Sequence, residues 1–260
     1  MIDIHCHILP FMDDGAADWE SALSMAADAL ADGIHTVVAT PHHANGQYLN
    51  PAADIISAVE TFRRKLEENG CPLRVLTGQE IRVNSGLLDE LEQGMLLPLA
   101  ESRYILLEMP SSRVPSSMAE VCHELVIQGY VPVIAHPERN AEVAEHPDKL
   151  ARLIELGALG QVTAQSVAGT FGGKLQKLSL DLCRRGLIHV VASDAHDNLR
   201  RPFGLSEAFR VIEKELGAAA GEFFRGNAEL LTENRVLTSG TFPQESTKRH
   251  KLFGFLSRKR

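Results

Sequence analysis

Short apolar segments rich in β-branched residues alternate along this chain with longer stretches of helical periodicity. The strand-like segments lie at residues 2–5, 36–39, 73–77, 104–107, 131–135, 160–163 and 188–192. Apolar residues three or four positions apart predict helices at residues 23–34, 55–66, 117–128, 147–156, 174–185 and 205–216. Strands that alternate with helices indicate an α/β fold with parallel strands. Seven or eight such units in about 235 residues favour a single-domain distorted (β/α)7 TIM-like barrel, with an open doubly wound sheet as the alternative.

The periodicity fades near the carboxyl end of the chain. No repeat, linker or low-complexity segment divides residues 1–238, which we expect to form one domain. Residues 239–260 contain Lys248-Arg249-His250-Lys251 and end in Arg258-Lys259-Arg260. We predict a basic, flexible tail. The alternative is a segment that makes peripheral contact with an anionic membrane surface or an acidic partner.

Composition excludes some classes of protein. The formal net charge is -8, whereas a general nucleic-acid-binding protein usually carries a basic face. The first residues lack a secretory signal, and no apolar run approaches the ~18 residues that span a membrane. Four scattered cysteines without CxxC spacing indicate reduced thiols. We therefore expect a cytoplasmic protein that does not bind nucleic acid. The sequence does not indicate an oligomeric state.

Residues able to bind metal ions follow most of the predicted strands. His5 and His7 lie on the same face of the first strand, because side chains at i and i+2 point the same way. Carboxyl ends of parallel strands meet on one face of a barrel, where we expect these side chains to converge. The candidates are His5, His7, Asp14, His42, Glu80, Glu108, His136, Asp194 and His196. This mixed histidine and carboxylate set, without a cysteine cluster, suits two or three ions of Mn, Fe, Zn or Mg.

Arginines accompany the candidate ligands. Arg139 follows His136 by three residues, and Arg201 lies in the loop after His196. Guanidinium groups bind phosphate through two hydrogen bonds, so metals and arginines together predict a phosphate-ester substrate. Cys6 lies between the two histidines on the strand, so its side chain should point to the opposite face. We expect it to pack in the barrel wall, where it would not act as a nucleophile.

The motifs together resemble the PHP (polymerase and histidinol phosphatase) superfamily. They are His5-x-His7, Asp13-Asp14-Gly15, Thr40-Pro41-His42-His43, Gly78-x-Glu80, Leu107-Glu108, Ala135-His136-Pro137-Glu138-Arg139 and Ser193-Asp194-Ala195-His196. More narrowly, the chain is similar to the manganese-dependent protein-tyrosine phosphatases of bacterial capsule and exopolysaccharide operons. The features specific to that group are Met1-Ile2-Asp3-Ile4-His5, Asn45-Gly46, Asn50-Pro51, Ser102-Arg103-Tyr104 and Arg201-Pro202.

The resemblance implies a PHP fold, a distorted barrel with three metal ions at its carboxyl-terminal mouth. One metal ion would take His5, His7, Glu80 and Asp194, a second Glu80, Glu108 and His136, and a third Asp14, His42 and His196. Arg139 and Arg201 would bind the phosphate, and His43 would support the site or face the substrate. The implied substrate is phosphotyrosine in a protein, with a membrane-anchored bacterial tyrosine kinase as the expected partner. The hypothesis is that hydroxide formed at the metal ions attacks phosphorus in line.

Other functions share these residues. A histidinol phosphatase, or another phosphoesterase or nuclease of the superfamily, would use the same metal ligands. The acidic charge weighs against a nuclease. A protein that keeps the metal site but only docks a kinase is a further alternative, which the complete set of ligands disfavours.

Overall fold

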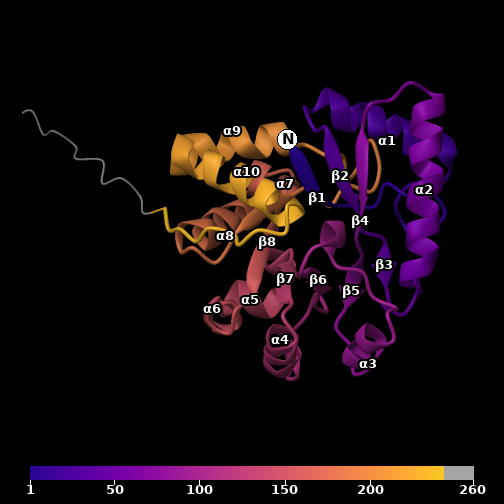
Figure 1. Cartoon of the computed structure of the whole chain (residues 1–260). Helices are drawn as coiled ribbons and strands as arrows, with labels where there is room; N and C mark the ends of the chain where they lie inside the picture. The colour runs from indigo at the N-terminus through magenta and orange to yellow at the C-terminus, as the bar shows by residue number, and fades with distance from the viewer. Residues whose placement is uncertain (243–260) are drawn as a thin grey trace, which may run out of the picture.

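Strands and helices alternate along the chain, as the sequence predicts. The computed structural model describes residues 1–242 (Figure 1). The strands are β1 (Ile2–Cys6), β2 (Thr36–Ala39), β3 (His42–His43), β4 (Arg74–Thr77), β5 (Glu80–Arg82), β6 (Tyr104–Glu108), β7 (Val131–Ala135), β8 (Leu159–Thr163) and β9 (Val190–Ala192). The helices are α1 (Trp19–Ala31), α2 (Ala52–Glu68), α3 (Leu87–Glu92), α4 (Met118–Ile127), α5 (Ala141–Glu145), α6 (Asp148–Glu155), α7 (Ala164–Ala168), α8 (Gly173–Arg184), α9 (Leu205–Leu216) and α10 (Ala218–Thr232), with 3-10 turns η1 (Leu99–Glu101) and η2 (Pro137–Arg139).

All strand pairs are parallel, and they form two sheets. One sheet has the order β1-β2-β4, and the other has the order β3-β5-β6-β7-β8-β9. The chain passes from β2 to β3 through Thr40-Pro41, and from β4 to β5 through Gly78-Gln79. The parallel α/β architecture is confirmed. A regular single barrel is not, because the strands divide between two sheets.

Backbone contacts join β1 to the end of β9. Cys6 forms a parallel bridge with Ala195, and the His7 N–H donates to the Ala195 carbonyl at 2.8 Å. The Asp194 N–H donates to the His5 carbonyl at 2.8 Å. The first strand therefore lies beside the last, and segments nearly two hundred residues apart meet at this seam.

Strand residues alternate between two buried apolar clusters. Ile105 and Leu107 of β6 belong to the cluster shared with the surrounding helices, whereas Leu106 belongs to a smaller inner cluster. Strands buried on both faces are expected in parallel sheets. The inner cluster also contains Ala228 and Leu231 of α10, a helix that the sequence analysis did not predict. The Tyr104 hydroxyl at the start of β6 donates to the Arg235 carbonyl at 2.6 Å, so α10 and the segment after it cover the amino-terminal ends of the strands.

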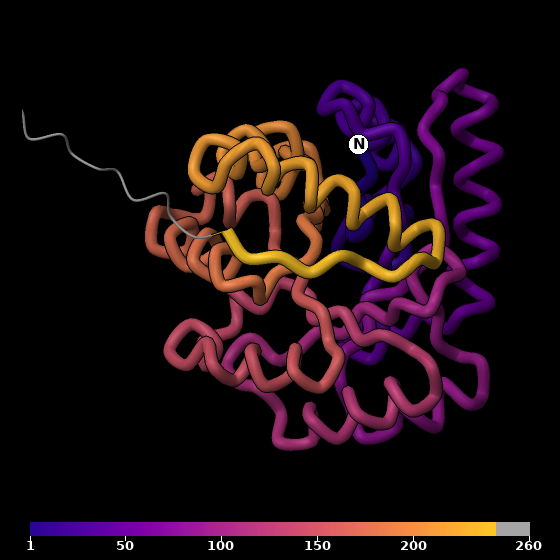
Figure 2. The backbone as a smooth tube through the Cα atoms, turned by 60° about the vertical axis from the view of Figure 1, so that its left-hand side comes forward, coloured from indigo at the N-terminus to yellow at the C-terminus, as the bar shows by residue number. Residues whose placement is uncertain are grey.

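The last described residues return along α10. Figure 2 shows the chain turning after α10 and running back beside this helix. Phe242 packs against Phe223 and Phe224, with ring centroids 5.2 and 5.7 Å apart. The predicted basic segment of residues 248–260 lies outside the described residues. Within residues 1–242, no helix is long and apolar enough to cross a membrane.

Close packing at β8 gives a test of the fold. A Cβ on Gly160 would lie 2.3 Å from the Leu187 carbonyl oxygen, whereas a Cβ on Gly173 would have no neighbour within 4 Å. Gly160→Ala should lower the free energy of unfolding by ~1–3 kcal/mol, because the backbone must shift. Gly173→Ala, at the first residue of α8, is the matched control and should be neutral or slightly stabilising. Urea unfolding of both variants measures the difference, and equal free energies would contradict the close approach.

Candidate metal centre

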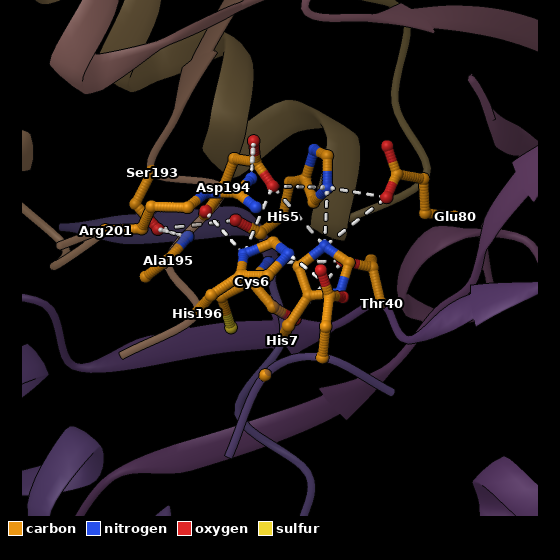
Figure 3. Close-up of polar contacts among 12 residues, drawn as sticks. His5, Cys6, His7, Thr40, Glu80, Ser193, Asp194, Ala195, His196 and Arg201 are labelled. Carbon is orange, nitrogen blue, oxygen red and sulfur yellow. Dashed lines mark hydrogen bonds and ion pairs between the residues drawn. The ribbon is translucent and has the colours of Figure 1, made fainter. Parts of the chain in front are cut away.

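His5 in β1 and His7 directly after this strand converge on buried carboxylates. His5 Nε2 and His7 Nε2 lie 3.2 Å apart, as their placement on one strand face predicts. These nitrogens lie 3.5 and 3.3 Å from Glu80 Oε2 at the start of β5. Both also lie 3.4 Å from Asp194 Oδ1, just after β9 (Figure 3). Four donors from three strand ends therefore surround one point.

Glu80 extends the cluster toward three further strands. His136 Nε2, after β7, lies 2.8 Å from Glu80 Oε1. His42 Nδ1, in β3, lies 2.8 Å from Glu80 Oε2 and 3.7 Å from Glu108 Oε2 at the end of β6. The structure thus brings Glu108 and His136 to the same carboxylate from neighbouring strands.

A more exposed group of donors forms the outer part of the cluster. Asp14 Oδ1 lies 3.4 Å from His42 Nε2 and 3.5 Å from His196 Nε2. The rings of His7 and His196 lie 3.8 Å apart. All nine candidate ligands are therefore in or beside one polar cluster. Their assignment as ligands remains a prediction.

Hydrogen bonds at Nδ1 of three histidines orient the Nε2 atoms that face the cluster. His7 Nδ1 bonds to Asp13 at 2.6 Å, and His5 Nδ1 bonds to Gln161 Oε1 at 2.9 Å. His196 Nδ1 bonds to the Asp194 carbonyl at 2.9 Å. An imidazole that donates from one nitrogen presents a lone pair at the other, as metal-binding histidines do. The sequence analysis gave no role to Asp13 or Gln161. Gln161 lies in β8, where it pairs with Ala135 of β7 and Val190 of β9. This position between two strands that carry donors at their ends was the available signal for its role.

Two of the loops that carry donors have unusual backbone angles. His136 and Asp194 have φ angles of 33° and 54° in the left-handed region, which residues other than glycine rarely adopt. Such angles persist where the surrounding structure determines them. The Asp194 backbone is held by the bond to the His5 carbonyl, and its side chain is held by two arginines.

Burial and neighbouring charges shift the pKa values within the cluster in both directions. Burial lowers the pKa of His7, but Asp13 and nearby carboxylates raise it well above its ordinary value. Burial raises the pKa of Glu80, but His42 and His5 outweigh this effect and hold it well below its usual range. Burial raises the pKa of Glu108, and the Glu80 charge raises it further. A divalent cation here would compete with protons for the histidines and would reduce repulsion between the carboxylates.

Several buried polar atoms lack a hydrogen-bond partner among the described residues. Those in the cluster are His42 Nδ1, Glu80 Oε2, Glu108 Oε2, Asp194 Oδ1 and His196 Nε2. Although His42 Nδ1 and Glu80 Oε2 lie 2.8 Å apart, their orientation is not that of a hydrogen bond. Unpaired buried polar atoms are costly, and a cation placed among them would offset that cost. The residues therefore fit divalent metal ions.

The donors form three overlapping groups. Within each group, the donor atoms lie within 4.8 Å of one another. The groups are His7, Asp14, His42 and His196; His5, His7 and Glu80; and His42, Glu80 and Glu108. His7, His42 and Glu80 each belong to two groups, whereas His136 and Asp194 belong to none. The groups therefore differ in detail from the division into three ions that the resemblance implies.

The predicted phosphate-binding arginines lie at the edge of the cluster. Arg139, at the end of η2, and Arg201 both donate to Asp194 Oδ2, and the Arg201 bond is 2.5 Å long. Their side chains remain 34 and 26% exposed. Each guanidinium thus keeps further N–H groups for an anion.

His43 and Cys6 face away from the cluster. His43 Nδ1 bonds to the Asn50 carbonyl at 2.9 Å, and Nε2 bonds to Glu90 of α3 at 3.2 Å. Both ring nitrogens are used there, so the structure does not bring His43 to the predicted catalytic position. The Cys6 thiol is buried near the Val38 carbonyl, and burial raises its pKa well above the ordinary value. Its expected role in packing is confirmed.

A parallel α/β fold with histidines and carboxylates at its strand ends is typical of metal-dependent hydrolases. Residues 1–233 match the family model for capsular polysaccharide synthesis proteins CpsB/CapC, and the chain belongs to this family. The family predicted from the motifs is confirmed.

Named relatives cover nearly the whole chain. It is 46% identical to tyrosine-protein phosphatase YwqE of Bacillus subtilis (strain 168) over 98% of this chain and 100% of the relative. It is 35% identical to putative tyrosine-protein phosphatase CapC of Staphylococcus aureus over the same shares.

Solved structures resemble the fold. One, from work on YwqE of Bacillus subtilis and CpsB of Streptococcus pneumoniae described as "unique metal-dependent tyrosine phosphatases", has a TM-score of 0.91 and 44% identity, covering 94% of this chain and 100% of the other. An organophosphorus hydrolase mutant has a TM-score of 0.57 at 13% identity, covering 89% of this chain and 92% of the other. This second likeness concerns the fold alone.

Metal binding should stabilise the chain through Glu80. Adding Mn²⁺ to chelator-treated protein should raise the melting temperature, because a ligand at 100 times its Kd stabilises the folded state by about 2.7 kcal/mol. Glu80→Gln removes the shared charge at the centre of the cluster and should abolish most of this rise. Glu60→Gln, on the exposed face of α2, is the control and should keep it. An unchanged rise in the Glu80 variant would remove Glu80 from the ligand set.

Proposed function

We propose that this chain is a metal-dependent protein-tyrosine phosphatase. The observation that carries the proposal is the convergence of nine histidine and carboxylate side chains, several with unpaired buried atoms, beside two arginines. Relatives that span nearly the whole chain are named tyrosine-protein phosphatases, which supports phosphotyrosine as the substrate. The description of the similar solved structure supports dependence on a metal.

The cluster would hold two or three divalent ions, with manganese favoured by the sequence resemblance. His5, His7, Asp14, His42, Glu80, Glu108, His136, Asp194 and His196 would supply the ligands. When bound, divalent metal ions lower the pKa of water toward ~7 and offset charge on the phosphoryl group. Mixed nitrogen and oxygen ligands also suit Fe, Zn or Mg.

The chain's own side chains would position the phosphoryl group. A cavity of about 70 Å³ lies beside the cluster, between Glu108, His136 and Arg139. Its size and its position beside Arg139 suit a phosphoryl group. Arg139 and Arg201 would donate to the phosphoryl oxygens with the N–H groups that Asp194 does not use. Because both guanidiniums are held by one carboxylate, they are oriented before the substrate arrives.

The proposal extends to the fold and the biological setting. The bridge between Cys6 and Ala195 supports one distorted barrel formed by the two sheets, within a domain of residues 1–238 and followed by a basic tail. The family's link to capsular polysaccharide synthesis supports a bacterial tyrosine kinase of that pathway as the cytoplasmic substrate.

A substrate panel tests the proposed function. The protein loaded with Mn²⁺ should hydrolyse a phosphotyrosine peptide with a higher kcat/KM than histidinol phosphate or a dinucleotide. The phenolate leaving group, with a pKa of ~10, requires less protonation than an alkoxide. Phosphate release measures all three reactions. A preference for histidinol phosphate would instead favour the histidinol phosphatase alternative, and no activity would favour a docking protein.

Loss of one arginine tests the phosphate-binding role. Arg139→Ala should lower kcat/KM for the peptide by ~10²–10³-fold, because an oriented donor to the developing charge is removed. Arg139→Lys should recover only part of the activity, since an ammonium lacks the planar fork. Arg64→Ala, on exposed α2, is the control. A kcat/KM for Arg139→Ala close to that of the parent would exclude this role.

A further inference from the structure

A groove leads away from Arg139 along helix α8. A cavity of about 530 Å³ begins at Arg139 and is also lined by Ala144, Lys174 and Leu178. A second cavity, of about 590 Å³, is lined by the same Ala144, Lys174 and Leu178 and continues toward Arg184. The shared lining makes the two cavities one groove. The other side is lined by Ala141, Ala144 and Glu145 of α5 and by Pro147 just before α6. Figure 1 shows α5 and α6 below α8.

The inner half of the groove is apolar. Phe171, in the turn before α8, is 37% exposed, although most large apolar side chains of the described residues are buried. Leu175 and Leu178 follow it along the helix and line the same cavity. Glu138 and Glu145 also line this half, but the Glu138 carboxylate is buried and accepts a bond from the Thr163 N–H. Glu145 of α5 is exposed, and its charge disfavours an acidic ligand there. Phe171, Leu175 and Leu178 make this half suited to an apolar side chain.

The outer half of the groove is basic. Lys174, Lys177 and Arg184 line it, and Asp181 is the acidic residue among its lining. Within residues 1–242, neither lysine forms an ion pair. Arg184 Nε is buried without a hydrogen-bond partner, and the guanidinium lies 3.9 Å from Glu215. In a chain of formal net charge -8, the two unpaired lysines make this half of the groove suited to an acidic ligand.

The length of the groove matches a short extended peptide. Lys174 and Arg184 are ten residues apart on one helix, which corresponds to about 15 Å. An extended chain covers that distance with about four or five residues. The groove begins at Arg139, the residue to which the proposed function assigns the phosphoryl group. A peptide whose phosphotyrosine occupies the metal cluster would therefore enter this groove with its neighbouring residues.

We propose that the α8 groove binds the polypeptide flanking the phosphotyrosine and selects an apolar residue close to it and acidic residues beyond. The inference rests on the proposed function and adds the class of peptide that the enzyme prefers. Lys174 and Lys177 determine specificity by ion pairing with acidic side chains, and Phe171 contacts the apolar residue. None of the three touches the reacting atoms.

Matched peptides test the preference. Two phosphotyrosine peptides of equal length carry either glutamate or glutamine on both sides of the phosphotyrosine, and p-nitrophenyl phosphate serves as a substrate without flanks. The protein should hydrolyse the glutamate peptide with a kcat/KM about tenfold above that of the glutamine peptide, as two partly exposed ion pairs allow. Raising the salt concentration should reduce this ratio, because salt screens exposed charges.

Charge reversal locates the preference. Lys174→Glu combined with Lys177→Glu should bring the ratio of the two kcat/KM values to one or below. Arg64→Glu combined with Lys65→Glu on α2 changes the net charge equally and should leave the ratio unchanged. Equal hydrolysis of the two peptides by the parent protein, or the same loss of ratio in both double variants, would overturn the inference while leaving the proposed function intact. Failure to hydrolyse p-nitrophenyl phosphate and both peptides would instead overturn the proposed function, and the groove's role with it.

Discussion

The arrangement of the site depends on one fully buried carboxylate, Glu80. His5, His7, His42 and His136 approach its two oxygens to within 3.5 Å, and they come from three different strand ends. An isolated carboxylate at this depth would be strongly destabilising, whereas one surrounded by histidines or cations is not. The strand ends must therefore meet closely for the chain to bury Glu80 at all. The stability of the fold therefore depends on the same histidine positions that form the site.

The seam between β1 and the end of β9 meets that requirement. Asp3, buried in β1, accepts bonds from the Ser193 N–H and hydroxyl. Burial raises the Asp3 pKa to about 6, against the lowering effect of the Ser193 bonds. Two residues further along, the His5 carbonyl accepts from the Asp194 N–H. The same pairing that joins first and last strands thus places His5 and His7 opposite the Asp194 carboxylate.

Much of this arrangement was predictable because parallel strands share one carboxyl end. All seven predicted strands are present, and their terminal polar residues converge. Side-chain alternation in β3 separates His42 from His43, but the sequence does not indicate which of them faces the cluster. That choice depends on Asn50 and Glu90, which engage His43 from other elements. The supporting role of Asp13 depends on a loop conformation that periodicity does not describe. Helix α10 was missed, although its buried Ala220, Phe224, Ala228 and Leu231 recur at spacings of three and four residues.

The site combines two regions with different physical demands. The side chains of His5, His7, Glu80 and Asp194, in or just after β1, β5 and β9, are at most 1% exposed. Cation binding there therefore depends on the rigidity of the core. Arg139 and Arg201 are partly exposed and face the solvent side, where an anionic substrate arrives. Asp194 connects the regions, because one carboxylate oxygen faces His5 and His7 and the other accepts hydrogen bonds from both arginines. A cation in the core and an anion at the mouth are therefore bound by residues that share one carboxylate. The buried metal-binding side chains would act in the same way on any phosphate ester. Discrimination between substrates therefore depends on the surface beyond the arginines.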